Sequence, residues 1–296
     1  MNWIFVALLE PIFHAFANIL DSNLANRLFK NAWLLSLIIT VAVTIFTPFV
    51  WLLDPPKFFP LHLLPYFIIV GAIELLYVYP YFKALQGDDT SVATSLFSLG
   101  KILVPILAFF LIGETLRPVQ YAGFLLIIAA SVALTFNPKA RLWFNRTFFY
   151  ILLSSALLAV EVVIFKYIFT QVSWGTGYVW TVVIASAIAL AALLPQLRRT
   201  DTRQELVALK KNYWLILLVG GASFLGNIGF SYAIFAVPAT VSRSIDSFQP
   251  FFVLLYAILF KRYFPLAFKE STNRRSLIKK IVLFAVMVIG VILTVR

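Results

Sequence analysis

The chain has 296 residues, of which 62% are hydrophobic and only 12% charged, with a formal net charge of +12 and a mean hydropathy of +0.95. Soluble domains carry roughly 25% charged residues, so this composition excludes an ordinary globular enzyme and predicts a polytopic helix bundle in lipid. The absence of cysteine excludes disulfides and thiolate metal sites, and two histidines argue against a histidine-based metal centre.

The basic residues lie in short loops between apolar segments, which is typical of positively charged cytoplasmic loops and not of a nucleic-acid groove. We therefore expect no metal, no cofactor and no nucleic-acid partner. The expected partners are the lipid bilayer and a small-molecule substrate.

Ten apolar segments approach the ~20 helical residues that cross the ~30 Å core of a bilayer. The first contains Glu10-Pro11, where the proline should kink the helix, and it lacks the basic start of a cleavable signal. The longest loops, 195–212 and 261–276, are basic and too small for a soluble domain. The segments cover residues 3–23, 31–53, 62–83, 90–112, 118–136, 148–170, 177–194, 213–235, 238–260 and 277–295.

The two halves of the chain repeat at an offset of 149 residues. The aligned pairs are Gly71 with Gly220, Ala84 with Ala233, Val92 with Val241, Ser95 with Ser244 and Ser98 with Ser247. The repeat predicts two five-segment units, 1–140 and 141–296. Because five is odd, the second unit must lie inverted in the membrane, an arrangement typical of secondary transporters.

Polar side chains gather on one helical face of some segments, as Glu10, His14 and Asn18 do at four-residue intervals. A charge that faces lipid costs at least ~2.5–3.5 kcal/mol, so these faces should line a cavity. Segments 1, 3, 4, 6, 8 and 9 are expected around it, and segments 2, 5, 7 and 10 outside. The candidate substrate-binding residues are Glu10, His14, Asn18, Glu74, Tyr77, Tyr81, Thr94, Ser98, Lys101, Glu161, Asn227, Tyr232, Arg243, Asp246 and Gln249.

Several of these residues have alternative interpretations. Arg243 and Asp246, three residues apart, either pair within their helix or contact substrate, where a helix N-terminus would favour a carboxylate or phosphate. Lys101 is expected to pair with Glu74, which lies at a similar depth, as a structural pair or as part of a substrate or proton site. His14 is expected to bond Glu10 or Asn18.

The buried acids and the glycines also have two interpretations each. Glu10, Glu74 and Glu161 are either sites of proton coupling or neutral, hydrogen-bonded side chains. The glycine cluster at 220–229 indicates close helix packing and not a phosphate site.

Residues 93–134 contain a helix rich in small residues, a Gly113-Glu114 turn and a helix with an early Gly123. Together with YFKAL (81–85) and SYAIF (231–235), this stretch resembles the ten-helix EamA-type branch of the drug/metabolite transporter superfamily. The resemblance implies an all-α integral membrane protein with ten transmembrane helices, formed by two inverted five-helix repeats around a central cavity. It also implies a multi-pass transporter, not an enzyme, in a bacterial or archaeal cell (inner) membrane.

The expected function is secondary transport, by alternating access, of a small polar or zwitterionic metabolite, such as an amino-acid-like one, that is exported or exchanged. Lys101 and Arg243 would bind a carboxylate, and the acids an amine. An anionic substrate such as a nucleotide sugar or phosphate ester is the alternative. An intramembrane enzyme or a lipid-handling subunit is the alternative of another class.

The loop charges predict the orientation. The loops after segments 1, 3, 5, 7 and 9 hold eighteen of the twenty-four Lys and Arg residues, and the opposite side holds three. Basic loops stay in the cytoplasm, so both termini are predicted outside. The resemblance implies the reverse, with both termini inside.

Overall fold

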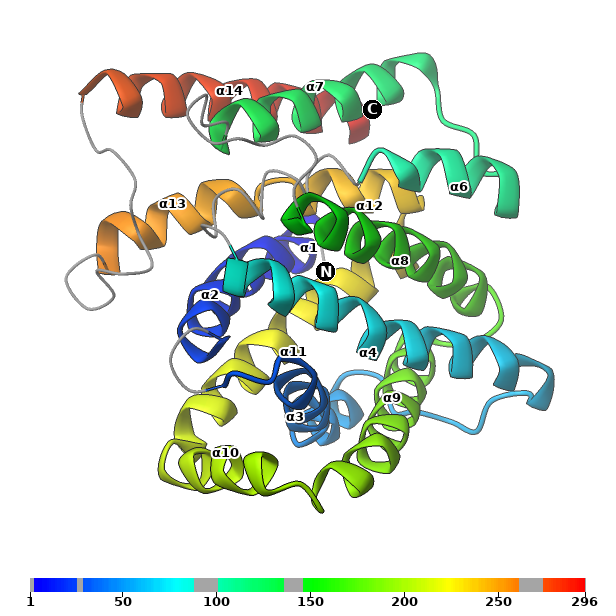
Figure 1. Ribbon diagram of the computed structural model, residues 1–296. Helices are drawn as coiled ribbons and strands as arrows, with labels where there is room; N and C mark the ends of the chain where they lie inside the picture. The colour runs from blue at the N-terminus through cyan, green and yellow to red at the C-terminus, as the bar shows by residue number, and fades with distance from the viewer. Residues whose placement is uncertain (1–2, 26–28, 88–100, 136–145, 261–273, 296) are drawn as a thin grey trace.

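The computed structural model describes residues 3–25, 29–87, 101–135, 146–260 and 274–295, and all regular elements within these ranges are helices (Figure 1). Six helical segments in them are long and apolar enough to cross a membrane. The ten-span count stays a prediction, because the other apolar helices found are shorter. The six segments are Trp3–Asn23, Ala32–Leu52, Leu61–Ala84, Phe148–Phe169, Trp174–Gln196 and Tyr213–Ala236.

The first membrane segment is interrupted near its start. Helix α1 covers Trp3–Ala7, and α2 covers Leu9–Asn23. Pro11 has no N–H to donate to the carbonyl of Ala7, so the break lies where the sequence predicts a kink. The interruption sets Glu10 in the first turn of α2, where its side chain is buried.

The second segment comprises α3 (Ala32–Thr44) and the 3-10 helix η2 (Thr47–Leu52). Asn31 caps α3, because its Oδ1 accepts hydrogen bonds from the backbone N–H groups of Trp33 and Leu34. The short η3 (Leu61–Leu63) then leads into α4 (Leu64–Gly87).

Helices α6 (Leu103–Ile112) and α7 (Pro118–Thr135) are joined by the Gly113-Glu114 turn. Gly113 has a φ of 68°, a left-handed conformation that ends α6 and that suits glycine. The turn directs Glu114 toward a helix of the second half of the chain, as described below.

The second half begins with α8 (Arg146–Phe169), α9 (Trp174–Gln196), α10 (Thr200–Lys211) and α11 (Tyr213–Ala236). The prediction of a loop over 195–212 was wrong, because most of it is helix α10. This helix has the sequence TDTRQELVALKK and packs against the start of α11.

The ninth segment is a broken helix. It forms α12 (Ala239–Asp246) and α13 (Gln249–Phe260), separated by Ser247 and Phe248. Pro250 is the second residue of α13, where a missing N–H costs nothing but where the helix cannot continue from α12. The last helix is α14 (Arg274–Val295), which lies along α7 on one side of the molecule (Figure 1).

Contacts between the two halves come in matched pairs. Helix α4 packs on α8 and α9, while α11, the corresponding helix of the second half, packs on α2 and α3. Likewise α6 packs on α8, while α13 packs on α2. If each helix is replaced by its counterpart in the other half, the contact of α4 with α8 becomes that of α11 with α2, and the other contacts are matched in the same way.

Helix α11 approaches α2 closely because two of its residues are glycines. A Cβ on Gly229 would lie 2.5 Å from the backbone nitrogen of Glu10, and a Cβ on Gly226 would overlap the ring of His14. The expectation that the glycine cluster permits close helix packing is confirmed.

Candidate substrate cavity

A cavity of about 150 Å³ lies among α2, α3, α4, α8, α9, α11, α12 and the start of α13. It is lined by elements from both halves of the chain. Its polar lining is Glu10, His14, Asn18, Asp21, Thr40, Glu74, Tyr77, Tyr81, Glu161, Ser223, Asn227, Arg243, Asp246 and Gln249.

Eleven of the fifteen candidate residues lie on this lining. Lys101 is not part of it but contacts one of its acids, and Tyr232 lies elsewhere. Thr94 and Ser98 fall outside the described residues. The eleven are Glu10, His14, Asn18, Glu74, Tyr77, Tyr81, Glu161, Asn227, Arg243, Asp246 and Gln249.

The division into six lining and four outer segments was wrong in part. Thr40 of α3 and Val182 of α9 line the cavity, although the second and seventh segments were expected outside. The second and seventh segments carry no charged residue in their interiors. The search for charged residues on one helical face, which identified the other lining segments, therefore could not identify these two. Asp21 was visible on the face shared with Glu10, whereas a lone Thr40 or Ser223 has no such pattern.

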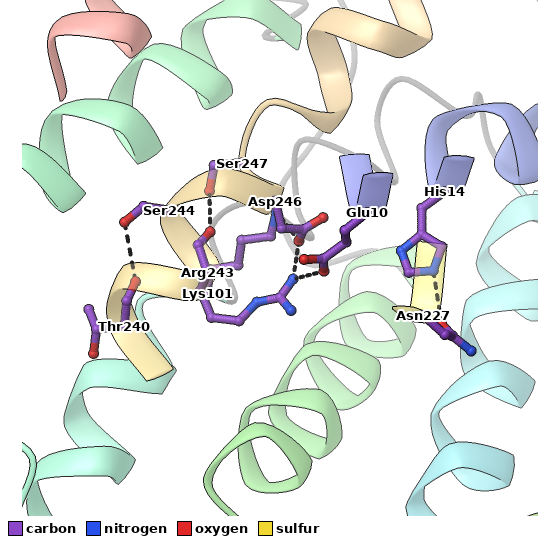
Figure 2. A network of polar contacts seen from close by, with 9 residues as sticks. All are labelled: Glu10, His14, Lys101, Asn227, Thr240, Arg243, Ser244, Asp246 and Ser247. Atoms are coloured by element: carbon purple, nitrogen blue, oxygen red, sulfur yellow. Dashed lines mark hydrogen bonds and ion pairs between the residues drawn. The ribbon is translucent and has the colours of Figure 1, made fainter. Parts of the chain in front are cut away.

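Four ionisable side chains form a buried charge network, which we define as Glu10, Lys101, Arg243 and Asp246 (Figure 2). Nη2 of Arg243 lies 2.7 Å from Oε1 of Glu10, and Nζ of Lys101 lies 2.6 Å from Oδ2 of Asp246. Arg243 also pairs with Asp246, and its guanidinium carbon lies 4.9 Å from the centre of the Phe230 ring. Two cations thus balance two acids, each side chain no more than 8% exposed.

The predicted Glu74–Lys101 pair was wrong, because Lys101 pairs with Asp246. A hairpin brings two residues to the same depth but does not fix the direction in which their side chains point. The intrahelical interpretation of Arg243 and Asp246 is confirmed as a contact, and Glu10 of α2 joins it.

The N-terminus of α12 is already occupied by a carboxylate of the chain itself. Oε2 of Glu114 accepts a hydrogen bond from the N–H of Ala239 at 2.7 Å, and Oε1 accepts from the N–H and hydroxyl of Thr240 at 3.1 and 2.8 Å. The expected anion site at this terminus was therefore wrong: Glu114 supplies the negative charge that the helix dipole favours. Helix α12 is held at its start by Glu114 and at its end by Lys101.

Two further polar contacts on the lining lie outside the charge network. Nε2 of His14 lies 3.0 Å from Oδ1 of Asn227, so the expected bond to Glu10 or Asn18 was wrong. Asn18 accepts a hydrogen bond from the Tyr81 hydroxyl at 2.7 Å.

Glu10, His14 and Asp246 bring three potential metal ligands within 4.8 Å of one another. The cations beside these carboxylates are Arg243 and Lys101, which already supply the balancing charge. The cluster therefore requires no further cation.

Glu74 of α4 and Glu161 of α8 form a second acidic group, which we call the acid pair. The two carboxyl groups are close enough to interact directly. Glu161 is 0% exposed, and neither of its oxygens has a hydrogen-bond partner among the described residues. No Lys or Arg of the described ranges forms an ion pair with either acid; the ion pairs found there belong to the charge network.

Neither Tyr232 nor Lys166 lines the cavity, and both make contacts with neighbouring helices or helix ends. The Tyr232 ring packs edge-on against Trp174, with ring centres 5.7 Å apart. Nζ of Lys166 donates to the carbonyls of Ile234 and Val237 at 2.9 and 2.7 Å, where its charge complements the C-terminus of α11.

The model of the EamA-like transporter family matches residues 1–136, just under half of the chain. The N-terminal part of the chain is similar to an EamA-like transporter domain. The EamA-like family belongs to the drug/metabolite transporter superfamily, whose members are membrane transporters. With the apolar helices, this similarity supports an integral, multi-pass membrane protein that acts on a small-molecule substrate.

No curated protein sequence matches the chain. A solved structure, titled only as the crystal structure of a protein, superposes with a TM-score of 0.64 over 96% of both chains at 15% sequence identity. This likeness concerns the fold alone, and it extends over the second half of the chain as well as over the EamA-like domain.

Proposed function

We propose that the protein is a secondary active transporter that exports or exchanges a small polar metabolite with an amine group, by alternating access. The observation that carries this proposal is the cavity between apolar helices, lined by eleven polar or charged residues that sequence periodicity had singled out. Polar groups at this depth are costly in a membrane unless they serve a substrate or ion path.

The matched contacts support an architecture of ten helices in two inverted repeats, 1–140 and 141–296. An exchange of α4 with α11, and of α8 with α2, preserves the packing, as expected if two related units face each other. The broken ninth segment is a second supporting feature, because interrupted helices commonly form the sites of transporters built from such repeats. In this proposal, the repeats rock about the cavity that lies between them.

The charge of the lining supports an amine in the substrate. Five acids line the cavity, and Arg243 is the cation among the lining residues described. A carboxylate of a zwitterion would have to share Arg243 with Glu10 and Asp246, whereas an amine finds the acid pair without a counterion. The same excess of acids disfavours the anionic alternative, a nucleotide sugar or phosphate ester.

We also propose the orientation that the loop charges favour, with both termini outside a bacterial or archaeal cell membrane. The support is the excess of Lys and Arg in the loops after odd-numbered segments. A reporter that is active only in the cytoplasm, fused after Arg296, should give no signal. A strong signal would overturn the orientation.

The function is tested by counterflow in liposomes that contain the purified full-length chain alone. We expect exchange of at least one labelled member of a panel of amino acids and amines. Tyr77→Phe, which removes a cavity hydroxyl, should raise the half-saturation concentration roughly five- to tenfold, the equivalent of about one hydrogen bond. Tyr213→Phe makes the same change at an exposed position outside the cavity and serves as the matched control. Exchange of no compound in any class would reject the transporter and favour an enzyme or a partner subunit.

A further inference from the structure

The acid pair consists of two carboxyl groups on adjoining helices of the two halves of the chain. Glu74 lies on α4 and Glu161 on α8, and both line the cavity. Glu161 is fully buried, and its oxygens have no hydrogen-bond partner in the described part of the chain. A buried, unpartnered carboxyl beside a second carboxyl in a cavity indicates a site for something positively charged.

The groups that face the pair do not supply that positive charge. Tyr77 of α4 and Tyr178 of α9, which interact with the pair, carry no positive charge. Tyr81 of α4 and Asp21 of α2, elsewhere on the same lining, carry none either. The facing cation is Arg243 of α12, which is bonded to Glu10 and Asp246.

Two carboxylate charges side by side in a buried site repel each other strongly. Such a pair needs either a proton or a cation to reduce its charge. It therefore has two forms of equal net charge, one protonated and one with a cation bound.

We propose that Glu74 and Glu161 form a subsite that binds the ammonium group of a substrate and, when that group is absent, holds one proton between them. The proposal rests on the transporter function given above and adds its driving reaction. When an ammonium group enters, the shared proton leaves to water, so that both carboxyl groups become ionised. The subsite then carries two negative charges and one positive charge, the same net charge as the singly protonated pair, so exchange of an ammonium group for a proton is electrically neutral.

The test is infrared difference spectroscopy on the purified full-length protein in detergent, with ethylammonium chloride as the probe and sodium acetate as the matched anionic salt. Ethylammonium should abolish a carbonyl band of protonated carboxyl in the wild type and release about one proton per ammonium bound to a pH-sensitive dye. Acetate should do neither. Failure of ethylammonium to change the band or release protons overturns the proposal.

Two variants assign the response to the pair. Glu74→Gln and Glu161→Gln should each lose it, and a response that persists in either variant overturns the assignment. Glu205→Gln, the same substitution on α10 outside the cavity, should keep the response. If a variant does not fold, the proposal is still tested by comparing the response of the wild-type protein to ethylammonium chloride with its response to sodium acetate.

The spectroscopic result is independent of flux. A response without counterflow of any compound would reject the transporter but keep the subsite. Counterflow without a response would keep the transporter and reject the subsite.

Discussion

Two groups of buried charge face the same cavity, and they differ in how the charge is balanced. The charge network sets Lys101 and Arg243 against Glu10 and Asp246 at ion-pair distances. The acid pair of Glu74 and Glu161 has no cation bonded to it in the described part of the chain. Burial is therefore common to both groups, and what separates them is whether a bonded cation compensates the charge.

The charge network and the acid pair also differ in the helices that they connect. The charge network joins α2, α12 and Lys101, two residues before α6, so its bonds hold elements of both halves together. The acid pair also spans both halves, but through α4 and α8, which already pack closely without it. Changes in the network should therefore cost stability, and changes in the acid pair should cost function.

The largest effect on stability is expected from Asp246→Asn. It removes the carboxylate shared by Lys101 and Arg243 and leaves two buried cations with Glu10 alone, which should cost about 3–5 kcal/mol. The loss would appear as a lower transition temperature of the purified protein in detergent.

Lys101→Met in the Asp246→Asn background should recover part of this loss, because the remaining Glu10 and Arg243 balance each other. A double variant as unstable as Asp246→Asn would contradict the account of the network.

A smaller loss is expected from Gly229→Ala, which breaks the network's geometry without altering a charge. Its Cβ would press on the backbone nitrogen of Glu10 at 2.5 Å and push α2 away, at a cost of about 1–3 kcal/mol. Gly221→Ala on the same helix is the matched control, because its Cβ would meet only the outer edge of the Phe46 ring at 3.2 Å. Equal transition temperatures for the two variants would show that the close approach does not matter.

The smallest effect on stability is expected from Glu161→Gln. No ion pair of Glu161 is lost in the described part of the chain, so the free energy of unfolding should change by less than ~1 kcal/mol. Comparison with Asp246→Asn by thermal denaturation sharpens the distinction between the two groups. A loss as large as that of Asp246→Asn would mean that Glu161 has a structural partner and that the distinction is false.

The sequence was informative about which faces turn inward. Glu10, His14 and Asn18 recur every four residues, and all three line the cavity, because the helical period and the cost of charge in lipid leave few alternatives. The all-helical class and the break at Pro11 follow from equally local rules.

The partners within the site could not be predicted in the same way. Lys101 pairs with a residue 145 positions away, and His14 with one 213 positions away. Such contacts depend on the rotation and tilt of packed helices, which periodicity does not specify. By contrast, the break between α12 and α13 had a local signal in Pro250, and α10 had one in its acidic start and basic end.

The central claim is that the cavity opens alternately to the two sides of the membrane. Because the chain has no cysteine, Ser223→Cys gives a single thiol on the cavity lining, and Ser131→Cys gives a fully buried control on α7. A membrane-impermeant thiol reagent is applied to either side of oriented vesicles, with and without a transported amine. We predict that Ser223→Cys reacts from both sides, that the amine raises one rate and lowers the other, and that Ser131→Cys does not react. Reaction of Ser223→Cys from one side only under all conditions, or from neither side, would contradict alternating access.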